Sequence, residues 1–547
     1  MNAFSCRCPG WVWMVCLGSR LIVSAFAAEV PEVSLKNAAE AEAKWAADER
    51  AAEAFFNGPI QQFEVNIDPE QMKALRRDAR NPVPARVRVG TNVFESVAVH
   101  VKGSAGSRRG IDEDPALTLN FDKLKPGQLC HGLAKLHLNN SVQDRTFANE
   151  NLASRIYLKA GIPTARASHA FVKLNGRDMG LYVLKEGYGS AFVRRHFPQD
   201  RKGNLYDGGF VRDIDQDLKL DYSRGVTNLS DLRALNAAMQ LPPSARRAKL
   251  PEVLDVERFI TYAALQCLMD DWDGYPRNRN NYRVYIDSHG RATFIPHGMD
   301  QLFQDVNRGV RGGWNGQVAI SVFELGENKA RLRERMDQLL HNEFSKTNLM
   351  QGVERIRERL RAACETARPE IWRHVEANLR GYQSQLIARY DNALAEVQAW
   401  PKPMKPAAPG ARFTLGEWQR MEQSGRPLFD AQPPRGETNR VVHIIAKKDN
   451  TLASYRAPAT LPPGNYRFTC RVKTRDLVPI SDRVGIGAGV RISHALRENS
   501  LSGTKDWTEL AFDFTREEAD SVEMVLELRA KRGEAWFDLD SIVLQAQ

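Results

Sequence analysis

The stretch DWDGYPRNRNNY, residues 271–282, gathers acids and amides into a loop that follows an expected helix over residues 253–272. Asp, Gly, Pro and Asn also build ordinary turns, so for this stretch alone a purely structural role is an equal alternative. An expected hairpin follows, with strands over 282–286 and 292–295, and Asp300 comes soon after it. An acid-bearing loop, a hairpin and a further acid form the order in which kinases hold a metal and a nucleotide.

The spacing within this stretch suggests individual roles. Asp273 and Asn278 are five residues apart, as are the kinase Asp that acts on the acceptor hydroxyl and the Asn that holds a magnesium ion. Asp300 then corresponds to the metal-binding acid. Hard divalent cations such as Mg²⁺ prefer these oxygen ligands. The pattern predicts Asp273 as a catalytic residue and Asn278 and Asp300 as metal ligands.

The preceding part of the chain fits the same plan. Strands alternate there with a Gly-Ser loop at 103–107, and the strand over 134–138 carries Lys135, while the expected helix over 144–160 carries Glu150. A strand Lys paired with a helix Glu can place its ammonium group against phosphate oxygens. Glu186 follows a hairpin with an Asn-Gly turn and lies where a hinge would meet adenine. The alternative for each residue is a surface ion pair worth ~0–1 kcal/mol.

Length and composition indicate several domains. A chain of 547 residues is too long for a single core. The expected organisation is a signal peptide at 1–28, a leader or charged helix at 29–59, a kinase-like domain at 60–399, a proline-rich linker at 400–412 and a β-sandwich at 413–547. Arg7, two apolar runs and Ala25-Phe26-Ala27 favour a cleaved export signal. An uncleaved anchor is the alternative, and no later segment is apolar enough to span a bilayer.

Charge and cysteine content narrow the partners. The net charge of +10 favours an anionic ligand or reflects a solvated basic face. No Lys/Arg block is present, which argues against nucleic acid. The four cysteines beyond the expected signal have no C-x-x-C spacing, so we expect buried thiols rather than a zinc site; they are Cys130, Cys267, Cys364 and Cys470.

Several stretches in this order resemble the spore coat protein H (CotH) kinase family across roughly residues 60–395. They are Lys102-Gly103-Ser104, LAKLHLNN at 133–140, residues 144–152, Gly180-Leu181-Tyr182 with Glu186, GNLY at 203–206, residues 271–285 and residues 295–300.

The resemblance implies an α+β, atypical protein-kinase-like bilobal domain and ATP-dependent phosphorylation of Ser/Thr on exported proteins. It implies ATP with Mg²⁺ or Mn²⁺ as cofactors and a periplasmic, cell-surface or secreted location. By this resemblance Asp273 is the loop acid, Asp300 binds metal, Asn278 and Asn281 are their amide partners, and Lys135 contacts phosphate. Lys102, Lys135, Glu186 and Asn281 are the expected nucleotide-binding residues.

Two departures from the family pattern bear on catalysis. The family usually has Trp-Asp-x-Asp where this chain has His297-Gly298-Met299-Asp300, so one acid is missing. Glu113 and Asp114 follow the Gly-Ser loop and are expected to repel ATP. Both features put the catalytic rate in question more than the fold.

The carboxy-terminal part resembles carbohydrate-binding jelly rolls, and it implies a glycan partner. Its alternating strands and turns, such as PPGN at 462–465, predict an all-β sandwich. Trp507 and Trp536 are expected either to stack on sugars or to lie in the core. The alternative function is a catalytically weak pseudokinase scaffold with a glycan-binding module. A polysaccharide-cleaving pair, Asp271 with Asp273, is a third reading.

Overall fold

The computed structural model describes residues 32–547 except 105, 226, 401–404, 448–449 and 517–519. The expected signal peptide at 1–28 and part of the expected linker lie outside these residues, as does Ala105 of the Gly-Ser loop. Among the described helices, none is both long and apolar enough to cross a membrane.

The amino-terminal lobe is a closed β-barrel with the strand order β1-β2-β3-β4-β5-β7-β6. Alternating burial along β2, with every second side chain inside, is the pattern that a sheet with one core face requires. The strands are β1 (Gln61–Asn66), β2 (Val83–Val89), β3 (Asn92–Lys102), β4 (Ala116–Asn120), β5 (Lys135–Asn139), β6 (Ala167–Leu174) and β7 (Arg177–Glu186).

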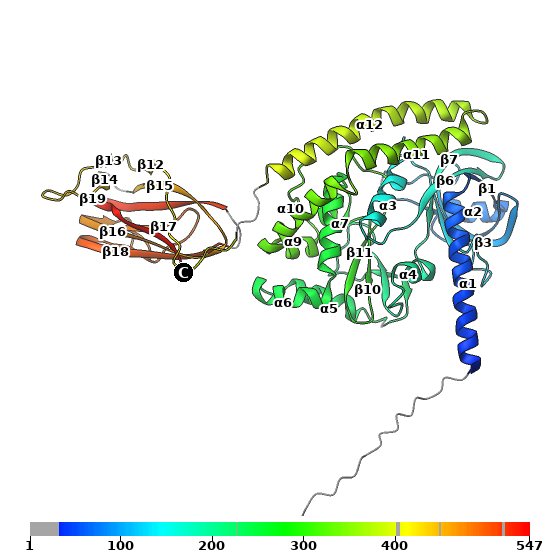
Figure 1. Cartoon of the computed structure of the whole chain (residues 1–547), viewed down its shortest axis with the longest axis horizontal. Helices are drawn as coiled ribbons and strands as arrows, with labels where there is room; N and C mark the ends of the chain where they lie inside the picture. The colour runs from blue at the N-terminus through cyan, green and yellow to red at the C-terminus, as the bar shows by residue number, and fades with distance from the viewer. Residues whose placement is uncertain (1–31, 105, 226, 401–404, 448–449, 517–519) are drawn as a thin grey trace, which may run out of the picture.

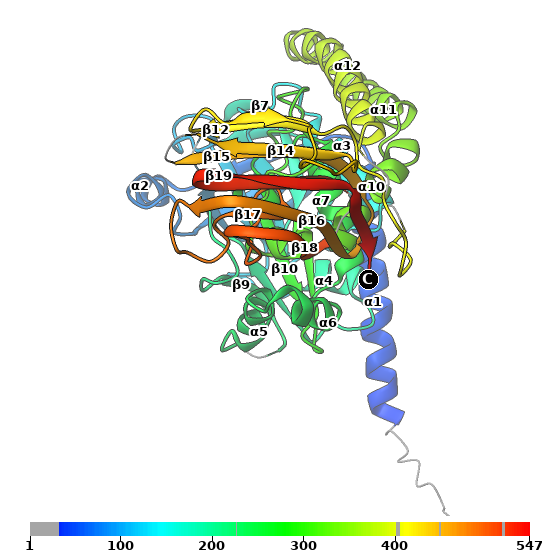
Figure 2. The same ribbon diagram turned by 90° about the vertical axis from the view of Figure 1, so that its left-hand side faces the viewer.

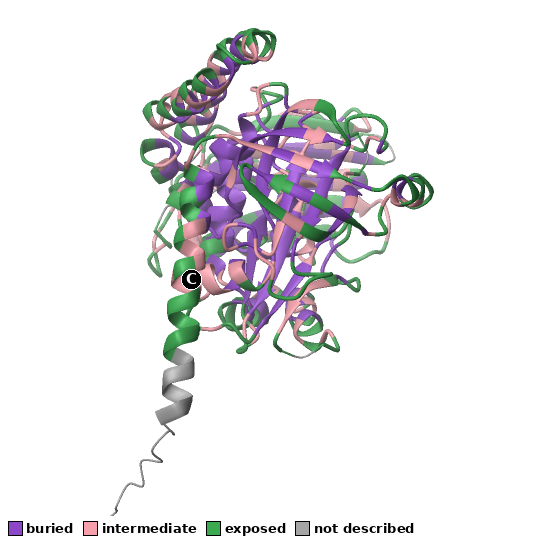
Figure 3. Cartoon of the chain, turned by 90° about the vertical axis from the view of Figure 1, so that its right-hand side faces the viewer, coloured by how far each residue is buried: buried purple, intermediate pink, exposed green. Residues whose placement is uncertain are grey.

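Three helices accompany this barrel: α1 (Glu32–Asn57), α2 (Pro69–Arg77) and α3 (Asn149–Lys159). Residues 39–44 of α1 are exposed, and the helix leads from there to a partly buried end, as Figure 3 shows. Its Phe55 and Phe56 belong to the barrel's apolar core. The segment predicted as a leader or charged helix is therefore helical over its described part and packs against the barrel through its last turns.

The second lobe is mainly helical and has a separate apolar core. Its small sheet has the order β11-β10-β8-β9, with β8 (Asn204–Asp207), β9 (Lys219–Ser223), β10 (Tyr282–Ile286) and β11 (Ala292–Pro296). The helices are α4 (Ser190–His196), α5 (Ser230–Met239), α6 (Pro243–Val253), α7 (Val256–Leu268), α8 (Tyr275–Asn278), α9 (Gln317–Phe323), α10 (Gly326–His341), α11 (Lys346–Cys364) and α12 (Pro369–Gln398). Figure 1 shows α11 and α12 running alongside each other above this lobe.

Two separate cores joined by one chain make the domain bilobal, as expected from the sequence. The predicted hairpins are present, and the Asn175-Gly176 turn has both residues at positive φ, as a tight hairpin turn requires. The expected helix over 144–160 begins only at Asn149. The Asp144 carboxylate accepts hydrogen bonds from the backbone N–H groups of Thr146 and Asn149 and from the Thr146 hydroxyl, which holds 144–148 as a turn.

The carboxy-terminal part is an antiparallel β-sandwich, as predicted, and its strands run across the view in Figure 2. Its strands are β12 (Gln419–Ser424), β13 (Leu428–Asp430), β14 (Val441–Ala446), β15 (Thr451–Leu461), β16 (Gly464–Pro479), β17 (Ala488–Ile492), β18 (Gly503–Arg516) and β19 (Asp520–Ala546). The first part of β19 lies between β15 and β17, and its later part lies between β14 and β16. One strand thereby helps to enclose the core from both sides.

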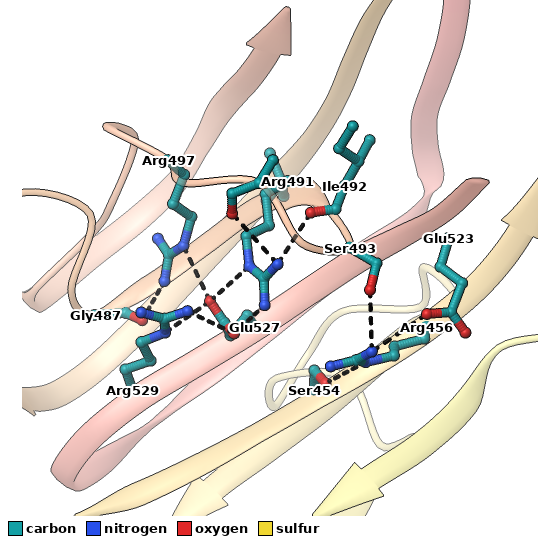
Figure 4. Close-up of polar contacts among 12 residues, drawn as sticks. Ser454, Arg456, Gly487, Arg491, Ile492, Ser493, Arg497, Glu523, Glu527 and Arg529 are labelled. Atoms are coloured by element: carbon teal, nitrogen blue, oxygen red, sulfur yellow. Dashed lines mark hydrogen bonds and ion pairs between the residues drawn. The ribbon is translucent and has the colours of Figure 1, made fainter. Parts of the chain in front are cut away.

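A buried ionic cluster lies on the face of β17 and β19 that points away from this core. Glu527 is fully buried, and its carboxylate accepts hydrogen bonds from Arg491 at 2.8 Å, from Arg529 at 3.1 Å and from Arg497 at 3.3 Å (Figure 4). The side-chain hydrogen bond and charge of Arg491, with the other arginines, outweigh the effect of burial. They lower the pKa of Glu527 to about 2.

The four described cysteines are all buried free thiols, as expected from their spacing. Burial raises the pKa of Cys130, Cys267, Cys364 and Cys470. The thiolate is the reactive form, so these side chains serve packing rather than chemistry.

Candidate active site

A cleft of about 550 Å³ lies between the two lobes, and both lobes line it. The barrel contributes side chains from β3, β4 and β5, and the helical lobe contributes the loop after α7 and the segment after β11. Asp273 and Asp300 both line this cleft. Its cations are Arg80, Lys102, Lys123, Lys135, Lys219 and Arg283. The cleft thus combines a basic barrel side with acids from the helical lobe.

Asp273 is held by three side-chain amides. Its carboxylate accepts from Asn278 at 2.7 Å, from Asn281 at 2.8 Å and from Asn280 at 3.1 Å. The single turn of α8 and the left-handed residues Arg279 and Asn281 fold the chain back around the acid. The asparagines of residues 271–282 therefore hold the Asp273 carboxylate in place at the cleft.

Asp300 is half-buried in the cleft. Burial, followed by the charge of Glu150, raises the pKa of Asp300 to about 7, although Lys102 and Lys185 oppose the rise. The backbone carbonyl of Asp300 accepts from the Asn149 amide at 3.0 Å, which ties the residue to the start of α3. A divalent ion bound at this carboxylate would favour its charged form and so offset the effect of burial.

Glu150 has a different partner from the one that the sequence suggested. Its carboxylate forms a buried ion pair with Lys185 of β7 at 2.7 Å, not with Lys135. The reason is strand register: His137 of β5 lies opposite Lys185, so Lys135 is displaced by two residues along the sheet. The Met299 N–H also donates to Glu150 at 3.1 Å, which links α3 to the segment that carries Asp300.

Lys135 and Lys102 both line the cleft, as expected for phosphate-contacting residues. Lys135 donates to the backbone carbonyl of Tyr188 at 3.2 Å. Lys102 donates to the Asn139 side chain at 2.5 Å. Burial, reinforced by Lys185, lowers the pKa of Lys102 to about 8, although Glu150 and Asp300 counteract this. Two cations therefore face the cleft from neighbouring parts of the barrel.

Glu186 and Asn278 do not line the cleft, contrary to the nucleotide-binding and metal-binding roles predicted for them. Glu186 pairs with Leu136 across the strands, so side-chain alternation turns it to the face opposite Lys185. There it forms ion pairs with Arg166 and Arg195. Asn278 donates to Asp273 but lines a separate cavity. Asn281, predicted to bind nucleotide, does line the cleft, together with Asn280.

Two further expectations are corrected by the same geometry. Glu113 and Asp114 are not among the cleft-lining residues, so they do not lie where they would repel a phosphate. Asp271 is buried and accepts from Gln266 at 2.9 Å. Burial, followed by the Asp273 charge, holds the pKa of Asp271 well above its usual range. It does not line the cleft, which removes the basis for a polysaccharide-cleaving pair with Asp273.

Several residues of the cleft were not predicted from the sequence. His137 shares a hydrogen bond with the Thr118 hydroxyl at 3.0 Å, and Arg283 lies 4.2 Å above the Tyr188 ring while pairing with Asp207 and Asp221. Burial keeps the pKa of His297 well below its usual range, so this imidazole is neutral. The alternation along KLHLN at 135–139 was a usable signal for His137, because it places that side chain on the same face as Lys135.

Gly298 occupies the position of the missing acid, and its surroundings explain why. Its φ is +58°, and a Cβ built there would lie 2.4 Å from the Asn281 side-chain oxygen. An acid at this position would displace the amide that orients Asp273. The position of the Asn281 side chain therefore depends on having glycine, and not an acid, at position 298.

The oxygen-rich donor set fits a hard divalent cation. The carboxylates of Asp273 and Asp300 face one cleft with the Asn281 amide. Among the described residues, no group of three or more His, Cys, Asp or Glu side chains is placed to hold a metal ion. The residues present suit a cation that also takes ligands from a bound phosphate or water.

The two tryptophans expected to stack on sugars or to lie in the core have different surroundings. Trp536 is buried, stacks on His443 with centroids 4.3 Å apart, and has Arg475 5.2 Å from its ring. Trp507 is partly exposed, and its ring N–H donates to Glu437 at 2.6 Å, with Arg471 and Lys473 close to the ring. Neither belongs to the apolar core of the sandwich.

A bilobal α+β domain with acids at its interlobe cleft defines a protein-kinase-like chain. A sequence model described as CotH kinase protein matches residues 99–400, and the chain belongs to this family. The resemblance noted from the sequence is thereby confirmed.

The similar proteins are distant. Inner spore coat protein H of Bacillus subtilis (strain 168) is 22% identical over 329 residues, covering 54% of this chain and 86% of that protein. Spore coat protein homolog 1 of Rhizopus delemar is 22% identical over 204 residues, covering 33% of this chain and 32% of its own length. Both relatives are spore-coat proteins by name.

Solved structures with partial likeness cover each half of the chain. The Helicobacter pylori proinflammatory kinase CtkA is 11% identical, with a TM-score of 0.28, and the match covers 55% of this chain and 97% of that one. The TmCBM61 structure in complex with β-1,4-galactotriose is 12% identical, with a TM-score of 0.19, covering 24% of this chain and 88% of that one.

Proposed function

We propose that the chain is an exported or surface-located kinase that transfers the γ-phosphate of ATP to Ser or Thr of other exported proteins. The observation that carries this proposal is the convergence of Asp273, Asp300 and the barrel cations on one interlobe cleft. A triphosphate is a polyanion, and the basic side of the cleft complements it, while the acids suit its divalent counter-ion.

In this proposal the residues of the cleft have different roles. Lys102 and Lys135 would lie against phosphate oxygens, and Asp300 with Asn281 would hold Mg²⁺ or Mn²⁺, which neutralises charge on the phosphates. Asp273 would orient the acceptor hydroxyl and receive its proton. The hydroxyl oxygen then bonds to the γ-phosphorus as the bond to the β–γ bridging oxygen breaks, and ADP leaves. The fixed carboxylate of Asp273 avoids reorganisation during this step.

The test is phosphate incorporation from labelled ATP into a protein substrate or into the chain itself. Asp273→Asn should reduce the rate by about 10²-fold or more, which is the usual effect of losing a group that moves a proton. Asp217→Asn is the matched control, because Asp217 is exposed and does not line the cleft. A fully active Asp273→Asn variant would refute the assigned role.

A second candidate is a nucleotide-binding pseudokinase scaffold whose sandwich binds glycans. The absence of an acid at Gly298 favours it, because one carboxylate fewer binds the divalent cation less tightly, and this cation neutralises charge on the phosphates. Nucleotide binding without measurable phosphate transfer in the wild type would select this alternative. Trp536 is buried and so gives no support to sugar stacking, whereas Trp507 is partly exposed.

A further inference from the structure

A second cavity, of about 520 Å³, lies on the other side of the acid-bearing loop from the cleft. The residues of its wall that matter here are Trp272, Arg277, Asn278, Arg308, Arg311 and Glu396. Trp272 precedes Asp273 in the chain, and the Asn278 amide donates to Asp273 at 2.7 Å. This cavity therefore adjoins the proposed catalytic acid through a single hydrogen-bonded side chain.

The wall of this cavity carries three guanidinium groups, those of Arg277, Arg308 and Arg311, and one carboxylate, that of Glu396. Arg308 pairs with the buried Asp270 at 2.6 Å. Arg311 donates to the backbone carbonyl of Glu396 at 2.5 Å, and the Glu396 carboxylate accepts from the Val310 N–H at 3.1 Å. Glu396 thus does not form a direct side-chain ion pair with either arginine, and the cavity keeps an excess of positive charge.

Arg277 carries the strongest signal. Its Nη2 donates to the Gly309 carbonyl at 2.5 Å, but its Nε and Nη1 are buried and have no hydrogen-bond partner among the described residues. Leaving the donors of a buried charged group unpaired is costly. A guanidinium group presents its donors as a planar fork that matches a carboxylate or a phosphate. Arg277 therefore brings an incompletely hydrogen-bonded guanidinium group to the wall of the cavity, beside the exposed Arg308 and Arg311.

Phosphorylation of the neighbouring chain segment cannot supply an anion for these arginines. The segment after Asp300, residues 301–316, forms part of this wall and contains no Ser, Thr or Tyr. It therefore has no hydroxyl that a kinase could phosphorylate to fill the cavity. An anion at Arg277 must come from another segment or another molecule.

We propose that this cavity binds an acidic side chain of the protein substrate, a carboxylate or a phosphorylated residue, while the acceptor hydroxyl lies at Asp273. This inference rests on the proposed kinase function and specifies its substrate class: Ser or Thr flanked by acidic residues. Arg277 and Arg311 act as specificity-determining residues, with Arg308 fixed by Asp270 as a supporting charge.

The experiment measures phosphorylation of matched Ser peptides by the full chain. One series places Glu, phosphoserine, Gln or Lys singly at each position on either side of the acceptor. We expect at least a tenfold higher kcat/KM for an acidic peptide than for its Gln counterpart, mainly through KM. The Glu and phosphoserine arms distinguish a carboxylate from a phosphate ligand.

Arg311→Glu should abolish this preference, because Arg311 is exposed and its replacement leaves the cleft intact. Arg277→Gln should weaken it as well, and Arg233→Glu, on an exposed position of α5, should leave it unchanged. Equal rates for acidic and Gln peptides in the wild type, or a preference that survives Arg311→Glu, would overturn the proposal.

Direct binding of the same peptides, followed by fluorescence anisotropy, separates this inference from the kinase function. If phosphate transfer is absent, an acidic peptide that binds the wild type and not Arg311→Glu still supports the cavity. If neither variant binds, the cavity proposal fails whether or not the chain binds ATP.

Discussion

At the scale of single residues, Asp273 and the amides around it define the site, and Gly298 limits how it can be altered. Restoring the acid that the family usually has, by Gly298→Asp, should not raise activity. The new side chain would collide with Asn281 and would require a left-handed backbone that Asp adopts only at a cost. We expect lower phosphate incorporation than in the wild type, and higher activity would contradict this account of Asn281.

Glu527 offers a residue-scale test of pH dependence in the sandwich. Its pKa falls from 4.5 to about 2 in the folded chain, so the charged carboxylate stabilises the fold by on the order of 3 kcal/mol above pH 4.5. This contribution is lost progressively as the pH falls from 4.5 toward 2. Acid unfolding of the sandwich, followed by tryptophan fluorescence, should show this dependence.

Glu527→Gln should remove that pH dependence and lower the free energy of unfolding at pH 7 by about 3–5 kcal/mol, because three buried or half-buried arginines lose their counter-charge. Glu523→Gln is a suitable control, since Glu523 is partly exposed and pairs only with Arg456. An unchanged acid transition in Glu527→Gln would show that the cluster is not what stabilises the sandwich.

Residue types and their order were enough to predict the acids of the site but not every partner. Asp273, Asp300, Lys102, Lys135 and Asn281 line the cleft as the sequence suggested. The exchange of Lys135 for Lys185 as the partner of Glu150 depends on strand register. The exclusion of Asn278 depends on one helical turn and two left-handed residues, which the five-residue spacing does not reveal.

At the scale of elements, the Lys185–Glu150 pair joins strand β7 to helix α3. Both side chains are 1–2% exposed, so removing one partner leaves a buried charge uncompensated. Lys185→Met should lower the free energy of unfolding by about 3–5 kcal/mol. Lys135→Met should cost less, because Glu150 keeps its partner. Chemical denaturation of the two variants should separate them, and equal losses would contradict the observed pairing.

Strands and hairpins were easier to predict than helix ends. Alternating side chains and turn residues predict the hairpins at β6–β7 and β10–β11. The short helices α2, α4, α5, α6 and α8 and the β8–β9 hairpin were not predicted, since their sequences lack a long periodic stretch. Closure of the seven barrel strands depends on the parallel β1–β6 pairing between distant segments, which no local pattern specifies.

At the scale of the whole molecule, α1 contributes to the barrel, although its segment was expected to be only a leader or a charged helix. We propose that the folded unit of the kinase-like domain includes α1. Phe55 is 7% exposed and belongs to the barrel core, so Phe55→Ala should lower the free energy of unfolding by about 3–5 kcal/mol. Ala51→Ser on the same helix is a mild control. An unaffected Phe55→Ala variant would mean that α1 docks without stabilising the barrel.

The central claim is that Asp300 and Asp273 hold a nucleotide and a divalent cation in one cleft, and thermal shift of the full chain with ATP and Mg²⁺ tests it most directly. A ligand at 100 times its dissociation constant stabilises by about 2.7 kcal/mol. We predict a clear magnesium-dependent rise in Tm for the wild type and Asp217→Asn, and none for Asp300→Asn. A rise in Asp300→Asn equal to that of the wild type would contradict the account.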